Sequence, residues 1–224
     1  MELYGWAMKQ GLVEANPVVG TGVPDEHVKP RERLLSEAEL VKVWQASRDD
    51  GYGAIIKLLI LTGCRRQEVG SMRWDELDQQ RGVWNIPGER TKNGRAHTLP
   101  LPDMAWSILA EVPHWHDGAF VFGRRAGFGA WAPNKRALDQ RAGITPWVLH
   151  DLRRSTATGM AEAGIQPHII EAVLNHVSGH KGGVAGVYNR AVYEPQMKAA
   201  LALWADHIRS LVEGGERTII PLRS

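Results

Sequence analysis

The spacing of apolar positions predicts a chain that is mainly helical. Residues 1–16 have the pattern of one amphipathic helix. A second helix is expected to open at Ser36, because Glu39 follows three residues later in the pattern of a capping box. A third runs from about Gly53 to Leu61 and ends at the Thr-Gly pair that follows.

Between residues 72 and 101 the pattern changes to short apolar runs, which predict three strands, around Trp74, at 83–87 and at 97–101. The Lys92-Asn93-Gly94 turn joins the last two, and Asn-Gly is a strong hairpin signal. Helical periodicity then returns, with helices expected at about 103–112, 133–142, 148–163, 167–175 and 194–213. The predicted fold class is therefore mainly α with a small three-stranded antiparallel sheet.

Proline, glycine and charged residues fill residues 17–34, which are interpreted as a linker. The main domain is expected over 35–213, followed by a C-terminal tail over 214–224. Within that tail, Thr218–Leu222 could form an edge strand or a docking segment.

Composition narrows the class of protein. Hydrophobic residues make up 43% of the 224, which argues against disorder, and the single cysteine, Cys64, excludes an intrachain disulfide. No signal peptide is recognisable, and the apolar run at 54–61 is too short to span a membrane, so a cytoplasmic protein is expected. The net charge of +2 does not by itself indicate nucleic-acid binding, but residues 122–160 hold seven basic and two acidic side chains.

Four segments carry candidate chemistry, although each alone is a modest signal. The first is Thr62-Gly-Cys-Arg-Arg-Gln-Glu68, at a predicted helix end. The second is the hairpin that holds Lys92, and the third is His150-Asp-Leu-Arg153, at a helix start. The fourth runs from Asn175-His176 to Tyr188-Asn-Arg.

In this order and at these spacings, the four segments resemble those of the tyrosine recombinase family. The sequence around Tyr188 is most similar to that of integrases of prophages and genomic islands. The resemblance covers essentially all of residues 35–213 and implies the catalytic-domain fold of that family. It also implies the reaction: a tyrosine hydroxyl attacks a DNA phosphodiester, forms a 3′-phosphotyrosyl bond and releases a 5′-hydroxyl. Neither metal, ATP nor any other cofactor is implied.

The resemblance implies that protein cations stabilise the charge of the transition state, since no metal does so. It assigns Arg65 and Arg153 to the scissile phosphate, where always-charged, bidentate guanidinium groups suit the task. His176 matches a further phosphate contact, and His150 matches a residue that binds the phosphate or accepts the tyrosine proton.

The remaining implied roles concern the nucleophile and the leaving group. Tyr188 matches the nucleophile, Lys92 the general acid that protonates the leaving 5′-oxygen, and Glu68 an acidic residue that orients other groups. Twelve positions separate His176 from Tyr188, more than in many relatives, which leaves open whether Tyr188 is docked without DNA.

Several assignments have competitors. Arg66 is adjacent to Arg65, and Arg90 and Arg95 flank Lys92 in the hairpin. Tyr193 competes with Tyr188, but is interpreted as a packing residue that opens the last helix. The spacing of His176 and His180 could suggest a zinc pair, although the glycine at position 179 breaks a helix there. Expected contacts to the DNA backbone are Arg66, Arg124, Arg125, Lys135, Arg136 and Arg154.

The resemblance also implies partners: double-stranded DNA attachment sites, further copies of the chain in a tetrameric synapse, and a directionality factor, with no role for a membrane. Residues 1–16 would be the C-terminal end of a core-binding helical domain, which makes Met1 a candidate fragment start. Two alternatives remain at this point. One is a non-catalytic DNA-binding module of the same fold, and the other is a relaxing enzyme of the type IB topoisomerase kind.

Overall fold

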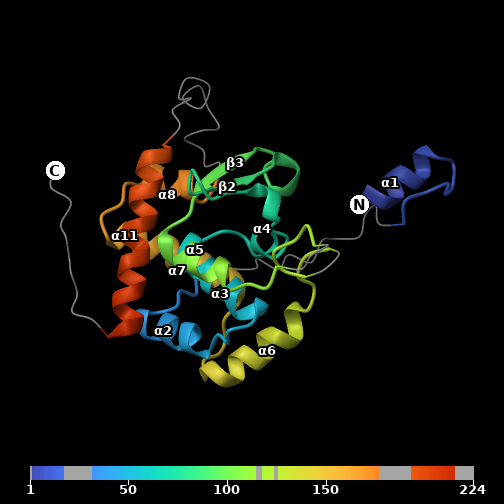
Figure 1. The fold of residues 1–224 in the computed structure, drawn as a ribbon. Coiled ribbons are helices and arrows are strands. Elements are labelled where there is room, and N and C mark those ends of the chain that lie inside the picture. Colours follow the sequence, from blue (N-terminus) through green and yellow to red (C-terminus); the bar gives the residue numbers. More distant parts are fainter. Residues whose placement is uncertain (1, 18–31, 115–117, 124–125, 177–192, 215–224) are drawn as a thin grey trace. The chain divides into compact units, whose positions relative to one another are not determined.

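A computed structural model describes residues 2–17, 32–114, 118–123, 126–176 and 193–214 (Figure 1). The chain divides into two compact units, Met1–Glu32 and Arg33–Ser224. In the first unit, α1 spans only Glu2–Lys9, so the prediction of a helix over residues 1–16 is too long. The helix ends early because the chain turns at Gly11, whose φ of 68° lies in the left-handed region.

The second unit is mainly helical with a small antiparallel sheet, which confirms the predicted fold class. Its helices are α2 (Glu37–Ala46), α3 (Gly51–Thr62), α4 (Arg66–Gly70), α5 (Asp103–Ala110), α6 (Trp131–Ala142), α7 (Leu149–Glu162), α8 (Pro167–Val173) and α11 (Glu194–Glu213). Its strands are β1 (Leu77–Asp78), β2 (Val83–Ile86) and β3 (His97–Pro100), and two short 3-10 turns are η1 (Trp74–Glu76) and η2 (Gly88–Arg90).

The first strand was predicted in the wrong place. Trp74 lies in the turn η1, and the strand that pairs with β2 begins only at Leu77. The cause is the Glu76 carboxylate, which accepts a hydrogen bond from the Arg73 main-chain N–H at 3.1 Å and so closes the turn. The sheet order is β1-β2-β3, with Trp84 paired to Leu99 across the central hairpin.

Helix α3 forms the centre of the core. Almost every residue from Tyr52 to Thr62 is buried, so the helix is apolar on all sides and must be covered by others. Its last turn leaves the Ile60 carbonyl available, and this oxygen accepts hydrogen bonds from Thr156 Oγ1 at 2.9 Å and Trp204 Nε1 at 2.8 Å. The end of α3 is thereby tied to both α7 and α11.

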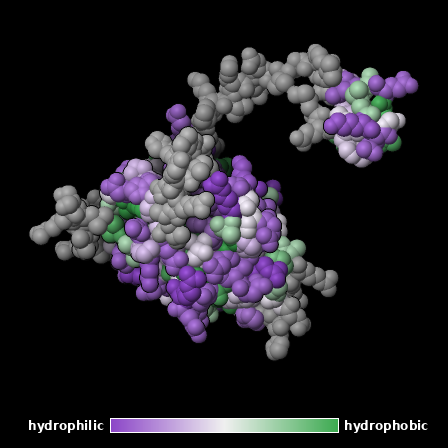
Figure 2. All heavy atoms as spheres, turned by 90° about the horizontal axis from the view of Figure 1, so that it is seen from above, coloured by the Kyte–Doolittle hydropathy of each residue, from purple (hydrophilic) through white to green (hydrophobic). Residues whose placement is uncertain are grey.

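The long helix α11 runs along one side of the unit, where it contacts α8 and β3 near its start and α2 near its end (Figure 1). None of the helices in the described part of the chain is long and apolar enough to cross a membrane. The face of the second unit seen in Figure 2 is largely hydrophilic. Among the described residues of this unit, the exposed large hydrophobic side chains are Leu34 and Val148.

Candidate active site

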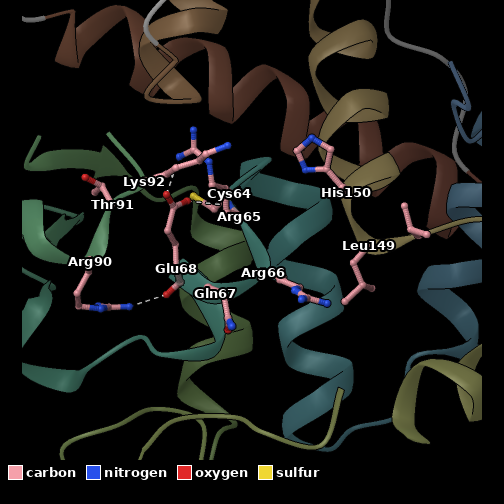
Figure 3. Close-up of a pocket in the computed structure, with 11 residues that line it drawn as sticks. Cys64, Arg65, Arg66, Gln67, Glu68, Arg90, Thr91, Lys92, Leu149 and His150 are labelled. Carbon is pink, nitrogen blue, oxygen red and sulfur yellow. Dashed lines mark hydrogen bonds and ion pairs between the residues drawn. The ribbon is translucent and has the colours of Figure 1, made fainter. Parts of the chain in front are cut away.

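Arg65, Lys92 and His150 come from three separate segments and line one open pocket of about 610 Å³ (Figure 3). The full lining consists of Cys64, Arg65, Arg66, Gln67, Glu68, Arg90, Thr91, Lys92, Val148, Leu149 and His150. The turn between α3 and α4, the hairpin and the start of α7 thus meet at this pocket. The lining includes three arginines, one lysine, one histidine and one glutamate.

The turn between α3 and α4 presents Arg65. Gly63 ends α3 in the left-handed region with φ of 63°, and Arg65 is the N-cap of α4. The buried Glu68 carboxylate holds Arg65 at two points: one oxygen accepts from its main-chain N–H and the other from Nη1, both at 2.7 Å. Glu68 therefore orients the Arg65 guanidinium.

Arg153 lies deeper than Arg65 and is only 7% exposed. Its Nη1 donates to the Gly63 carbonyl at 2.8 Å and its Nη2 to the Leu174 carbonyl at 2.7 Å. Burial lowers the pKa of Arg153, and the neighbouring positive charge of Arg65 lowers it further. The Arg153 guanidinium is thus held at the Gly63 carbonyl, two residues before Arg65 in the chain, but Arg153 is not among the residues that line the pocket.

The hairpin offers three cations, and their surroundings differ. Arg90 forms an ion pair with the buried Glu76, and its Nη2 donates to the Glu68 carbonyl at 2.7 Å, so this guanidinium is held within the fold. Lys92 and Arg95 are both exposed, but of these two only Lys92 lines the pocket. The geometry therefore favours Lys92 as the hairpin cation of the site.

His150 is exposed at the start of α7, and its pKa is lowered by partial desolvation of the ring and by the charges of Arg154 and Arg153. The adjacent Asp151 is fully buried; its carboxylate accepts from the Val148 main-chain N–H and from Arg154 Nη1, both at 2.9 Å. Asp151 thus fixes the helix start from which His150 projects. A neutral imidazole at this position can accept a proton near neutral pH.

His176 directly follows the turn that ends α8, is exposed, and is not among the residues that line the pocket. The predicted nucleophile Tyr188 and the histidine at position 180 lie outside the described residues. The competing tyrosine, Tyr193, is half-buried and packs against the core, with its ring in edge contact with His168 at 5.2 Å between centroids. Such packing agrees with the interpretation of Tyr193 as a structural residue.

The basic side chains expected to contact DNA fall into different environments. Arg66 and Arg136 are exposed, and the Arg66 guanidinium lies over the Trp131 ring at 5.7 Å. Arg154 is paired with the buried Asp151, while Arg124 and Arg125 lie outside the described residues. Lys135 is held internally: its ammonium group contacts both Asp139 oxygens, at 2.6 and 2.7 Å, and the Trp147 carbonyl at 3.0 Å.

Sequence reasoning did not identify four supports of the site. Buried Glu76 pairs with Arg90, which was considered only as a competitor of Lys92, and Asn93 and His97 hydrogen-bond to the end of α8. Asn93 carried a signal, but the Asn-Gly pattern indicates a turn rather than a distant contact. Nothing in the sequence indicates which polar side chains of the sheet face inward.

Two other chemistries can be considered for the pocket. Burial raises the pKa of the Cys64 thiol to about 12, and Glu68 adds to the shift, so this cysteine is not a ready thiolate nucleophile. Among residues 2–17, 32–114, 118–123, 126–176 and 193–214, no group of three or more His, Cys, Asp or Glu could hold a metal ion.

Comparison with known proteins identifies a family whose model matches this chain. The model of the phage integrase family matches residues 32–191. Prophage integrase IntA of Escherichia coli (strain K12) is 31% identical over 229 residues, which cover 95% of this chain and 53% of that protein. The chain spans about half the length of the curated prophage integrases it matches, since the share for a second one, IntZ of the same strain, is 56%.

Solved structures share the fold. An integrase from mycobacterium phage Brujita superposes with a TM-score of 0.64 at 20% identity and covers 94% of this chain and 73% of the integrase. A lambda integrase tetramer bound to a Holliday junction gives a TM-score of 0.57 at 20% identity, over 79% of this chain and 56% of that one. At these identities the likeness concerns the fold, and it confirms the predicted catalytic-domain architecture.

Proposed function

The chain belongs to the phage integrase family, and from that membership we propose that it is a site-specific DNA recombinase that cleaves and rejoins DNA through a 3′-phosphotyrosyl intermediate. The observation that carries the proposal is the pocket itself. Residues far apart in sequence, Arg65, Lys92 and His150, line it together, and Arg153 donates to the carbonyl of Gly63, two residues before Arg65. A DNA phosphodiester is an anion that such a group of cations would bind.

In the proposed reaction the Tyr188 hydroxyl oxygen attacks the phosphorus, and the bond from phosphorus to the 5′-oxygen breaks. Negative charge that develops on the non-bridging oxygens is stabilised by Arg65 and Arg153, which are already oriented by Glu68 and by main-chain carbonyls. Because these groups do not have to reorganise, they can supply the stabilisation that a metal ion gives in other phosphoryl-transfer sites. We therefore propose a cofactor-independent enzyme.

Cleavage requires two proton transfers, one from the attacking tyrosine and one to the leaving 5′-oxygen. His150, with its lowered pKa, accepts the proton of the tyrosine hydroxyl or hydrogen-bonds the phosphate, and His176 adds a further phosphate contact. Lys92 donates a proton to the leaving 5′-oxygen, which would otherwise depart as a strongly basic alkoxide. Rejoining reverses these steps with the 5′-hydroxyl of another strand, so the energy of the broken bond is kept in the phosphotyrosyl link.

The partners follow from the same proposal. Double-stranded DNA attachment sites are the substrate, and exposed Arg66 and Arg136 are the best-placed described candidates for contacts to its backbone. A lambda integrase of the same fold is known as a tetramer on a Holliday junction, which supports a synapse of several copies here. A directionality factor remains part of the proposal by analogy with the family.

The test is covalent selection. The chain is incubated with nicked duplexes that carry a randomised segment, and DNA that remains attached in SDS is sequenced. The nick lets the short fragment that carries the released 5′-hydroxyl diffuse away. Rejoining is then prevented, so a phosphotyrosyl complex accumulates. We expect attachment by the wild type in the presence of EDTA, none by Tyr188→Phe, and attachment by the matched control Tyr193→Phe. Binding without attachment by the wild type would support the non-catalytic module, and relaxation without strand exchange would support the topoisomerase alternative.

A further inference from the structure

Three consecutive main-chain carbonyls at the end of α8 each accept a hydrogen bond from a side chain of another segment. The carbonyl of Val173 contacts His97 Nε2 at 3.0 Å, that of Leu174 accepts from Arg153 at 2.7 Å, and that of Asn175 accepts from Asn93 at 3.0 Å. The last carbonyls of a helix have no partner within it, and they carry partial negative charge. The end of α8 is thus a fixed point to which both the hairpin and α7 are attached.

Asn93 contacts Asn175 at two oxygen atoms. Its Nδ2 donates to both the main-chain and the side-chain oxygen of Asn175, each at 3.0 Å, across 82 residues of sequence. Its Oδ1 accepts from Thr91 Oγ1 and from the Arg95 main-chain N–H, each at 3.1 Å. Both ends of the amide are therefore used, one within the hairpin turn and the other on α8.

The two residues lie beside two groups of the proposed site. Asn93 directly follows Lys92, and Asn175 directly precedes His176. Asn175 has φ of 48°, a left-handed conformation that asparagine adopts more readily than most residues and that turns the chain at the end of α8. The contact between the two asparagines therefore sets the distance between the main chain at Lys92 and the main chain at His176.

We propose that Asn93 is a positioning residue: its contact with Asn175 holds the hairpin turn so that Lys92 reaches the same scissile phosphate as His176. The inference rests on the proposed function, because it assigns Asn93 a role in that reaction. Lysine has a flexible four-carbon stem, so only the placement of its main chain limits where the ammonium group can be. A misplacement of about 1 Å can cost about a hundredfold in rate.

The experiment compares two nicked substrates of the selected sequence, with oxygen or sulfur as the bridging 5′ atom. A thiolate leaves without protonation, so the sulfur substrate does not need Lys92. We expect Asn93→Ala to form the covalent complex about tenfold to a hundredfold more slowly than the wild type on the oxygen substrate, and to come within about threefold on the sulfur substrate. Lys92→Ala should show the same pattern more strongly, and Asn93→Ala should add little to it in the double variant.

Matched variants separate this role from a general effect on folding. Asn134→Ala removes an asparagine whose Nδ2 donates to the carbonyl of Ala130, the N-cap of α6, at 2.8 Å, and we expect wild-type rates. Asn175→Gly keeps the left-handed main chain and the main-chain acceptor but loses the side-chain oxygen, so a smaller defect with the same recovery on sulfur is expected. It also provides a second readout if Asn93→Ala does not fold.

Equal slowing of Asn93→Ala on both substrates would overturn the inference. So would a double variant whose fold reduction in rate equals the product of the reductions of Asn93→Ala and Lys92→Ala. A wild-type rate on the oxygen substrate would overturn it as well. These results differ from failure of the proposed function, in which the wild type forms no covalent complex or Tyr188→Phe still forms one.

Discussion

The guanidinium group of Arg153 donates a 2.7 Å hydrogen bond to the main-chain carbonyl of Leu174, 21 positions further along the chain. Its other terminal nitrogen reaches the carbonyl of Gly63, at the end of α3. One side chain on α7 therefore joins the ends of α3 and α8, and one of its acceptors, Gly63, directly precedes the pocket residue Cys64. A residue expected to bind phosphate is also part of the scaffold, which means that its loss should affect both stability and activity.

Arg153→Ala should lower the free energy of unfolding by about 2–4 kcal/mol, because two main-chain carbonyls lose their partner and a buried side chain is removed. Urea denaturation of the wild type and the variant measures the difference. The control is Arg136→Ala, at an exposed position, which should change stability by less than about 0.5 kcal/mol. An unaltered midpoint for Arg153→Ala would mean that water replaces the guanidinium without cost.

Glu68→Ala should slow covalent complex formation by about tenfold or more, since Arg65 loses both contacts that orient it. Stability should also fall, by about 1–3 kcal/mol, because the buried end of an ion pair is removed. Glu68→Gln keeps one carbonyl oxygen and should recover part of both losses. Single-turnover rates and denaturation curves check the two effects separately, and a Gln variant no better than Ala would argue that only the charge matters.

Local sequence signals predicted the elements well where side chains close to one another in sequence decide the structure. The capping box at Ser36 and Glu39 is present, with the hydrogen bonds that the pattern predicts. The last helix was expected over 194–213 and spans Glu194–Glu213. In both cases, residues within one turn of each other determine where the helix begins or ends.

The turn at Trp74, where a strand was expected, and the supports of the pocket could not be predicted in this way. Glu76 closes a turn through Arg73 and also pairs with Arg90, 14 residues away, and its role depends on how the sheet folds back. The contact between Asn93 and Asn175 likewise depends on the packing of α8 against the hairpin. Of the residues that motif order singled out as catalytic, Arg65, Lys92 and His150 line the pocket, whereas the groups that hold them in place are visible only in three dimensions.

The two neighbouring cations Lys135 and Arg136 should respond differently to substitution. Lys135→Met should reduce stability by about 1–2 kcal/mol, because it removes the contacts with Asp139 and Trp147, while the salt dependence of DNA affinity should not change. Arg136→Ala should leave stability nearly unaltered and reduce the slope of log affinity against log salt by about one, if Arg136 contacts a phosphate. Titrations at several salt concentrations decide, and a reduced slope for Lys135→Met would restore it as a DNA contact.

His150 should give cleavage a dependence on pH. Its pKa is lowered by burial and by Arg154 and Arg153, so the imidazole is neutral and able to accept a proton at neutral pH. The single-turnover rate should be flat from about pH 8 down to the ordinary histidine value of about 6.5 and fall only below it. His150→Gln should be slow and should lose this acid limb.

The stability of the folded chain should also decrease as pH falls. The unfolded chain takes up one proton at each of His150 and His97 near pH 6.5, whereas in the folded chain both pKa values are lowered and the rings stay neutral there. The free energy of unfolding must therefore decrease as pH falls through this range. Once pH drops below the folded pKa values, these two histidines contribute no further decrease. His97→Gln separates the two effects: it should reduce the slope of stability against pH but keep the acid limb of the rate. An acid limb that survives in His150→Gln would assign the proton acceptor to another group, and His176 is the first to test.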